Sequence, residues 1–177
     1  MARVRVLGIG NVLNTDDGVG PFTARTLVAG WELPPEVEVL DAGTPGLDLV
    51  GLLQGLSAVV LVDAVQDRGA PGEVRRLDRA QLVRGGQRLV TSPHEPGLRE
   101  ALQLMEFQGG APADVTLWGA IPACTTLGTA LSPAVRGAVP ALIEGVLSEL
   151  RRLGVEARRR AVPSDPDIWW ERAPAAG

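Results

Sequence analysis

Apolar residues gather along this chain in short runs of two kinds, and their spacing predicts strands that alternate with helices. Three runs, at 4–9, 57–65 and 114–122, are almost wholly apolar and rich in β-branched residues. Such runs are typical of parallel strands that are buried on both faces of a sheet. The segments 36–43 and 72–78 alternate apolar and polar residues instead. The second of these follows a Gly/Pro turn, so we expect an antiparallel edge strand there.

Apolar residues at intervals of three and four predict the helices between these strands. One predicted helix covers 18–30, a second begins at Pro45, a third follows a loop within 91–107, and the last covers 131–154. Thr44 and Ser132 occupy the positions of N-cap residues, each followed by a proline that suits the first helical turn. Pro140 lies inside the last helix and predicts a kink.

This order of elements predicts a single α/β domain with a twisted, mostly parallel sheet and helices on both faces. We assign this domain to residues 1–154. Residues 155–177 contain several Pro and Asp residues and no sustained apolar period, so we expect an irregular C-terminal tail that adds little to the core. The pair Trp169 and Trp170 is the exception, because two indoles could dock on the domain or on a partner.

Composition narrows the possible functions. A net charge of −4 over 177 residues argues against a nucleic-acid partner, which requires a basic surface. A single cysteine excludes an internal disulfide framework and suits the reducing cytoplasm. No apolar run reaches about 18 residues, and the N-terminus lacks the layout of a signal peptide. We therefore expect a cytoplasmic protein that does not insert into a membrane.

The first candidate functional residues follow directly after the first predicted strand. Gly8 and Gly10 break the strand, and Asp16 and Asp17 follow at once. A dinucleotide site is disfavoured, because Leu13 stands where the third glycine of G-x-G-x-x-G is required and two acids would repel a pyrophosphate. Two interpretations remain open from the residues alone. Asp17 caps the following helix while Asp16 is solvated, or a carboxylate here is a metal ligand or catalytic acid.

The segment GIGNVLNTDDGVG resembles the N-terminal signature of the hydrogenase maturation proteases, the endopeptidases that trim the large-subunit precursor of nickel–iron hydrogenases. The resemblance covers about residues 3–153 and includes the segments VVLVD at 59–63, SPH at 92–94 and DAGTPG at 41–46. It implies the α/β architecture already predicted, as a single three-layer sandwich built on a five-stranded sheet.

Three candidate site residues come from three separate element ends: Asp17, Asp63 and His94. The carboxyl ends of neighbouring parallel strands meet at one edge of a sheet, so these side chains can share a cleft. Two carboxylates and an imidazole suit a divalent metal with open positions for water or substrate. Taken singly, each Asp could be a loop cap and the histidine incidental. The resemblance implies that Asp17, Asp63 and His94 are the metal-binding and catalytic residues. We interpret Asp16 as a structural partner of this site.

Three further features are ambiguous. The turn at 41–44 is either a cleft wall that contacts the substrate or a plain strand–helix connection. Glu95 either tunes the charge of the cleft or points to solvent. Cys124 could form a nucleophile pair with His94, but a single intracellular cysteine is more often a small buried apolar residue. The resemblance places no catalytic cysteine here, and residues 123–126 lack the acids that many relatives carry.

The resemblance implies an endopeptidase that removes the C-terminal extension of a nickel-loaded hydrogenase large-subunit precursor. Nickel is then carried by the substrate, the precursor is the partner, and we expect a monomer with no organic cofactor. The metal could polarise the scissile carbonyl or activate a water, or one carboxylate could act as general base. The chain has neither H-E-x-x-H nor G-x-S-x-G. The alternative is a non-hydrolytic metal-binding or chaperone module of the same fold.

Overall fold

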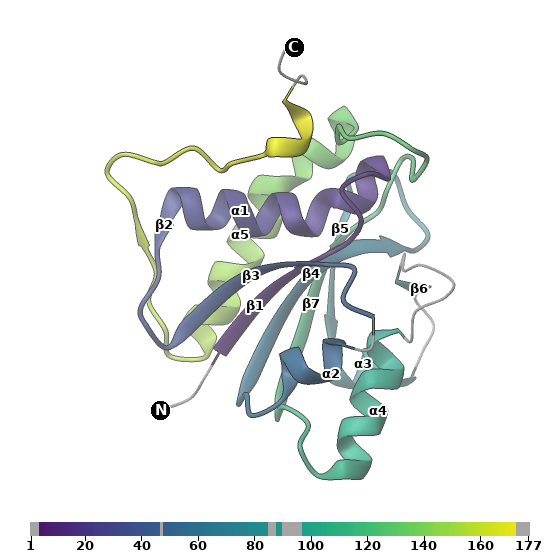
Figure 1. The fold of residues 1–177 in the computed structure, drawn as a ribbon, viewed down its shortest axis with the longest axis vertical. Coiled ribbons are helices and arrows are strands. Elements are labelled where there is room, and N and C mark those ends of the chain that lie inside the picture. Colours follow the sequence, from purple (N-terminus) through teal and green to yellow (C-terminus); the bar gives the residue numbers. More distant parts are fainter. Residues whose placement is uncertain (1–3, 47, 85–87, 90–96, 173–177) are drawn as a thin grey trace.

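The computed structural model describes residues 4–46, 48–84, 88–89 and 97–172. Its sheet has the strand order β3-β1-β4-β7-β5, and the first four strands run parallel (Figure 1). The last strand, β5, is antiparallel to β7, as the sequence predicts for this edge. The short β6 pairs with the end of β4. The strands are β1 (Val4–Ile9), β3 (Val37–Gly43), β4 (Ala58–Gln66), β5 (Val74–Asp78), β6 (Arg88–Leu89) and β7 (Asp114–Ala120).

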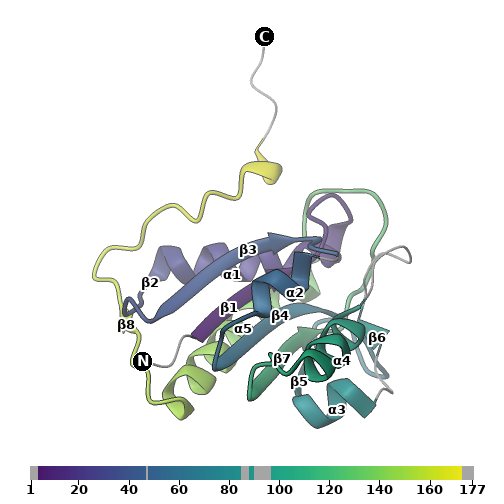
Figure 2. The same ribbon diagram turned by 60° about the horizontal axis from the view of Figure 1, so that its bottom comes forward.

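Helices cover both faces of this sheet, which confirms the three-layer α/β sandwich. The helices α1 (Val19–Gly30) and α5 (Pro133–Arg152) pack on one face. The other face is covered by α2 (Asp48–Leu53), α3 (Arg79–Arg84) and α4 (Leu98–Gln108), as Figure 2 shows. Both faces of β1 and β4 are therefore buried, which is why these strands are almost continuously apolar.

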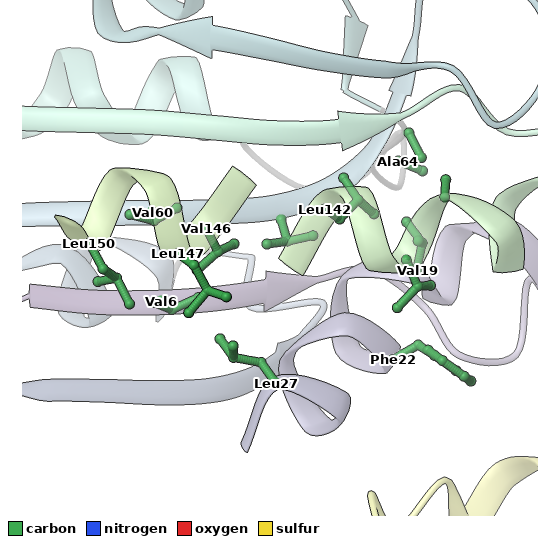
Figure 3. Packing of buried hydrophobic residues seen from close by; sticks show 14 of the residues in the cluster. Val6, Val19, Phe22, Leu27, Val60, Ala64, Leu142, Val146, Leu147 and Leu150 are labelled. Carbon is green, nitrogen blue, oxygen red and sulfur yellow. The ribbon is translucent and has the colours of Figure 1, made fainter. Parts of the chain in front are cut away.

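Alternate residues of the central strands supply the two apolar clusters. Val6 and Val60 point to the face covered by α1 and α5, where they pack with Leu27 and Leu147 (Figure 3). Leu7, Val59 and Leu61 lie in the cluster on the opposite face. This separation follows from the two-residue period of a strand. The cores on both sides hold β1 and β4 firmly beside each other.

Two predicted helix starts had different outcomes. The start of α5 is confirmed, because Ser132 Oγ accepts a hydrogen bond from the Val135 N–H at 3.3 Å and Pro133 follows as first residue. One helix continues across Pro140 to Arg152. The predicted start at Pro45 is wrong, since α2 begins at Asp48, whose N–H donates to the Pro45 carbonyl in a turn.

The segment after α5 adds more to the core than its sequence indicates. Val155 and Trp170 are each 6% exposed and belong to the cluster under α1 and α5. The intervening chain forms β8 (Arg158–Arg159), which pairs antiparallel with β2 (Trp31–Glu32), and then runs past the end of α1 (Figure 2). Trp170 lies in a short 3₁₀ helix, η2 (Trp169–Glu171).

Within the described part of the chain, no helix has the length and apolar character needed to cross a membrane.

Candidate active site

The parallel neighbours β1 and β4 end at the same edge of the sheet, and each delivers an acid there. Their register pairs Gly8 with Val62, so the chain leaves β1 beside Asp63 of β4. A turn at Gly10 and Asn11 then leads into a 3₁₀ helix, η1 (Thr15–Gly18), which contains Asp16 and Asp17. The carboxyl edge predicted from the sequence therefore carries both Asp17 and Asp63.

Gly10 lies between the two acids and requires the absence of a side chain. Its φ of +138° is rare for other residues, and an ideal Cβ on it would lie 1.8 Å from the Asp17 carbonyl oxygen. The same Cβ would lie 3.7 Å from Asp63 Oδ1. The next residue, Asn11, donates its backbone N–H to Asp17 Oδ2 at 2.9 Å. This turn therefore brings the backbone of η1 close to β4 and orients the Asp17 carboxylate.

Asp63 is fully buried, and its surroundings oppose its ionisation. Burial raises the pKa of the Asp63 carboxyl well above its ordinary value, and the neighbouring Asp17 carboxylate raises it further, against a lowering by the backbone N–H of Ala64. That N–H donates to Asp63 Oδ1 at 2.7 Å. Among the described residues, Asp63 Oδ2 has no hydrogen-bond partner. Two close carboxylates of this kind favour a bound cation or proton.

Asp16 has the structural role expected from the sequence. It is fully buried, and its Oδ2 accepts hydrogen bonds from the N–H groups of Ala123 and Cys124 at 2.8 and 3.1 Å. Ser132 adds two more, from its N–H to Oδ1 at 2.6 Å and from its hydroxyl to Oδ2 at 2.9 Å. Asp16 thus ties η1 to the loop after β7 and to the start of α5.

The third candidate, His94, lies outside the described residues, as does Glu95. Within the described ranges, no group of three or more His, Cys, Asp or Glu residues could hold a metal ion. The structure therefore brings two of the three predicted residues to one edge, and the placement of His94 stays a prediction.

Cys124 differs from its expected burial. It is exposed, and its Sγ lies 2.9 Å from the Thr126 hydroxyl. Hydrogen bonds from Thr126 lower the pKa of the thiol, with a smaller contribution from Thr15. Its backbone rather than its thiol takes part in the site, by donating to Asp16 and accepting from Thr15 Oγ1 at 2.7 Å.

An open groove of about 300 Å³ adjoins the acid-bearing turn. The turn at 41–44 forms one wall of it, where Asp41 accepts a hydrogen bond from Arg25 Nε at 2.8 Å. Arg25 also lies 5.4 Å over the Trp170 ring. The C-terminal segment is therefore part of the groove, which the sequence did not reveal because Arg25 and Trp170 are far apart in the chain. The groove is lined by Gly10, Asn11, Val12, Leu13, Arg25, Asp41, Gly43, Thr44, Trp169 and Trp170.

Known proteins are similar to this chain both in sequence and in fold. A sequence model described as hydrogenase maturation protease matches residues 22–149. Hydrogenase 2 maturation protease from Escherichia coli K12 is 36% identical over 164 residues, which are 92% of this chain and 99% of that protein. The protein HupD of Rhizobium leguminosarum bv. viciae, described as hydrogenase expression/formation protein, is 33% identical over 177 residues, covering 96% and 88% of the two chains.

The structure of the hydrogenase maturating endopeptidase HybD from E. coli superimposes with a TM-score of 0.82 at 34% identity, over 90% of this chain and 98% of that one. The shared architecture includes the sheet whose carboxyl edge carries the acid pair. The chain therefore belongs to the hydrogenase maturation protease family and is a peptidase of that family.

Proposed function

We propose that this peptidase removes the C-terminal extension of a nickel–iron hydrogenase large-subunit precursor that already carries its nickel. Family membership supports the reaction class, and the E. coli relative is named for maturation of hydrogenase 2. In this proposal the precursor is the partner, nickel enters with it, and the peptidase acts as a monomer without an organic cofactor. The exposed free thiol of Cys124 fits a reducing compartment, so the proposed location is the cytoplasm.

The buried acid pair is the observation that carries the proposal. Asp63 is fully buried beside Asp17, and both burial and that neighbour disfavour its charge. A divalent cation would reverse this balance, because it neutralises both carboxylates where water cannot. Carboxylate oxygens and an imidazole are acceptable ligands for nickel, so Asp17 and Asp63 would contact the metal of the substrate together with His94.

Binding of the substrate nickel by these residues would also position the scissile peptide bond. Nickel held at the acid pair would polarise the scissile carbonyl or lower the pKa of a water that attacks it. In the alternative course, one of the two carboxylates acts as the general base that takes a proton from the attacking water. The alternative is a module that binds the metal without hydrolysing a peptide bond. Family membership gives that alternative no support.

Mass spectrometry of the precursor C-terminus tests this function. Nickel-loaded precursor should be shortened and nickel-free precursor should stay intact. Asp17→Ala, Asp63→Ala and His94→Ala should each abolish cleavage while the fold is retained, because each removes one ligand. Asp48→Ala is the matched control, since Asp48 is exposed at the start of α2. Equal cleavage of both precursor forms, or full activity of His94→Ala, would overturn the role of substrate nickel.

A further inference from the structure

Three large apolar side chains remain exposed around the acid-bearing turn. Leu13 is 48% exposed, Leu127 is 87% exposed and Trp169 is 52% exposed. The loops of Leu13 and Leu127 are joined, because the Gly128 N–H donates to the Leu13 carbonyl at 2.9 Å. Leu13 and Trp169 line the same groove. We call these three residues the apolar rim.

The backbone holds Leu127 outward in a well-bonded loop. The carbonyl of Gly128 accepts from the Thr15 N–H at 2.8 Å. The single Thr15 hydroxyl hydrogen is shared between the carbonyls of Cys124 and Thr126, which lie 2.7 and 3.2 Å from Oγ1. The exposure of Leu127 is therefore built into the fold. When a partner covers an apolar side chain that is held in water in this way, the burial lowers the free energy of the complex.

The segments that carry Leu13 and Leu127 also lack charge. Residues 11–15 and the mostly exposed loop 122–130 contain no Asp, Glu, Arg or Lys, although such residues make up 21% of the chain. The centres of protein–protein interfaces are depleted of charged residues and enriched in aromatic ones. The part of the rim at Leu13 and Leu127 thus fits an uncharged, apolar protein surface, while Arg25 and Asp41 line the groove beside Trp169.

The rim adjoins the turn that orients Asp17. Asn11, which donates its N–H to Asp17, stands two residues before Leu13 and lines the same groove. A protein bound to the rim would therefore lie beside the turn that leads to Asp17. We propose that the apolar rim is the docking surface for the folded body of the large-subunit precursor, through an apolar patch next to its C-terminal extension. This inference rests on the proposed function and adds the surface that recognises the substrate.

Steady-state kinetics with purified nickel-loaded precursor test the rim. Leu127→Asp should raise KM by about fivefold or more, the effect of losing an interface anchor. It should leave kcat within about twofold, because Leu127 does not touch the acid pair. Trp169→Ala should act in the same direction. Phe107→Asp is the control: Phe107 is 91% exposed near the end of α4 that leads toward the start of β7, away from the acid-bearing edge.

Direct binding separates this inference from the proposed function. If the wild-type protein cuts the precursor and Leu127→Asp shows an unchanged KM, the docking surface is wrong and the function stands. If the wild-type protein does not cut, the affinity for the same precursor is measured by calorimetry, and about fivefold weaker binding by Leu127→Asp still supports the rim. Sedimentation tests a second copy as the occupant: a wild-type dimer that Leu127→Asp dissociates would overturn the inference.

Discussion

Gly20 of α1 lies directly against the backbone of Val62 in β4, the residue before Asp63. An ideal Cβ on Gly20 would lie 2.3 Å from the Val62 carbonyl oxygen and 2.1 Å from the carbonyl oxygen of Ile9. The first turn of α1 therefore packs on the sheet edge with no room for a side chain. This contact sets how closely η1 and its acids approach β4.

Gly20→Ala should destabilise the protein by about 3 kcal/mol or more, because two backbone carbonyls would have to move. Gly137→Ala is the matched control in α5, where a Cβ would meet none of the described residues within 4 Å. It should stabilise the protein by about 0.5–1 kcal/mol through the better helix propensity of alanine. Urea unfolding measures both, and equal stability of the two variants would contradict the close contact.

Asp63→Asn should make the protein more stable at neutral pH and abolish its peptidase activity. Because burial and Asp17 raise the pKa of folded Asp63, the folded state binds a proton more readily than the unfolded state. This contribution to stability therefore falls as pH rises from the ordinary aspartate pKa through the folded pKa. The neutral amide avoids that loss and still accepts the Ala64 N–H. Urea unfolding across a pH series should show the two proteins converging in acid, and a less stable variant at neutral pH would contradict this.

Glu149→Gln should lower the free energy of unfolding by about 1–2 kcal/mol at neutral pH, because it weakens two charged hydrogen bonds to partly exposed arginines. Burial raises the pKa of Glu149, but the hydrogen bonds from Arg76 and Arg152, each 2.6 Å between Nε and a carboxylate oxygen, outweigh it and lower the pKa overall. The stabilisation is thus present above the ordinary glutamate pKa and is lost as pH falls through the folded one.

The exposed pair of Glu144 and Arg151 supplies the control for that prediction. Glu144→Gln should change stability by no more than about 0.5 kcal/mol, because water screens the pair. Denaturant unfolding at neutral and acidic pH measures the free energy of unfolding of both variants. A deficit of Glu149→Gln that persists unchanged in acid would show that packing, not charge, is responsible.

Trp170→Ala should lower the free energy of unfolding by about 2–4 kcal/mol, as expected for a buried aromatic side chain. Its neighbour Trp169 meets it edge to face at 5.6 Å but is half exposed, so Trp169→Ala should cost no more than about 1 kcal/mol. Thermal melting of the two variants compares them. Truncation at residue 156 should lower the melting temperature at least as much as Trp170→Ala, and an unchanged melt would mean that the tail is dispensable.

Cys124→Ala should process precursor at a near-normal rate. The thiol is exposed and bonded to Thr126, and the backbone of Cys124, which the substitution keeps, makes the contacts to Asp16. Mass spectrometry of the product, with circular dichroism to check the fold, measures this. Loss of processing in a folded variant would restore the cysteine–histidine mechanism.

Sequence reasoning succeeded where one local pattern decides the structure. The runs at β1, β4 and β7 are continuously apolar because both faces of these strands are buried, and Ser132 with Pro133 marks the start of α5 through a local cap. The joint position of Asp17 and Asp63 followed from the rule that parallel strands end together.

Two of the differences from the sequence predictions depend on contacts between distant segments, and one depends on a local turn. The burial of Trp170 accompanies its contact with Arg25, and the groove at the acid-bearing turn includes residues from 10 to 170. The start of α2 was placed too early, because Pro45 serves a turn rather than a first helical position. No periodicity or spacing in the sequence encodes the contacts between residues as far apart as Arg25 and Trp170.

The hydrogen bonds of the Asp16 carboxylate affect when the acid-bearing turn can take its final structure during synthesis of the chain. Its four bonds go to residues 107, 108 and 116 positions later in the chain. A ribosome releases the acid-bearing turn early, yet the groups that fix the turn emerge only after most of the chain has been synthesised. Contacts of such long sequence separation form slowly and late. An unfinished chain that ends before these residues would therefore contain Asp16 and Asp17 without the contacts that fix their turn in place.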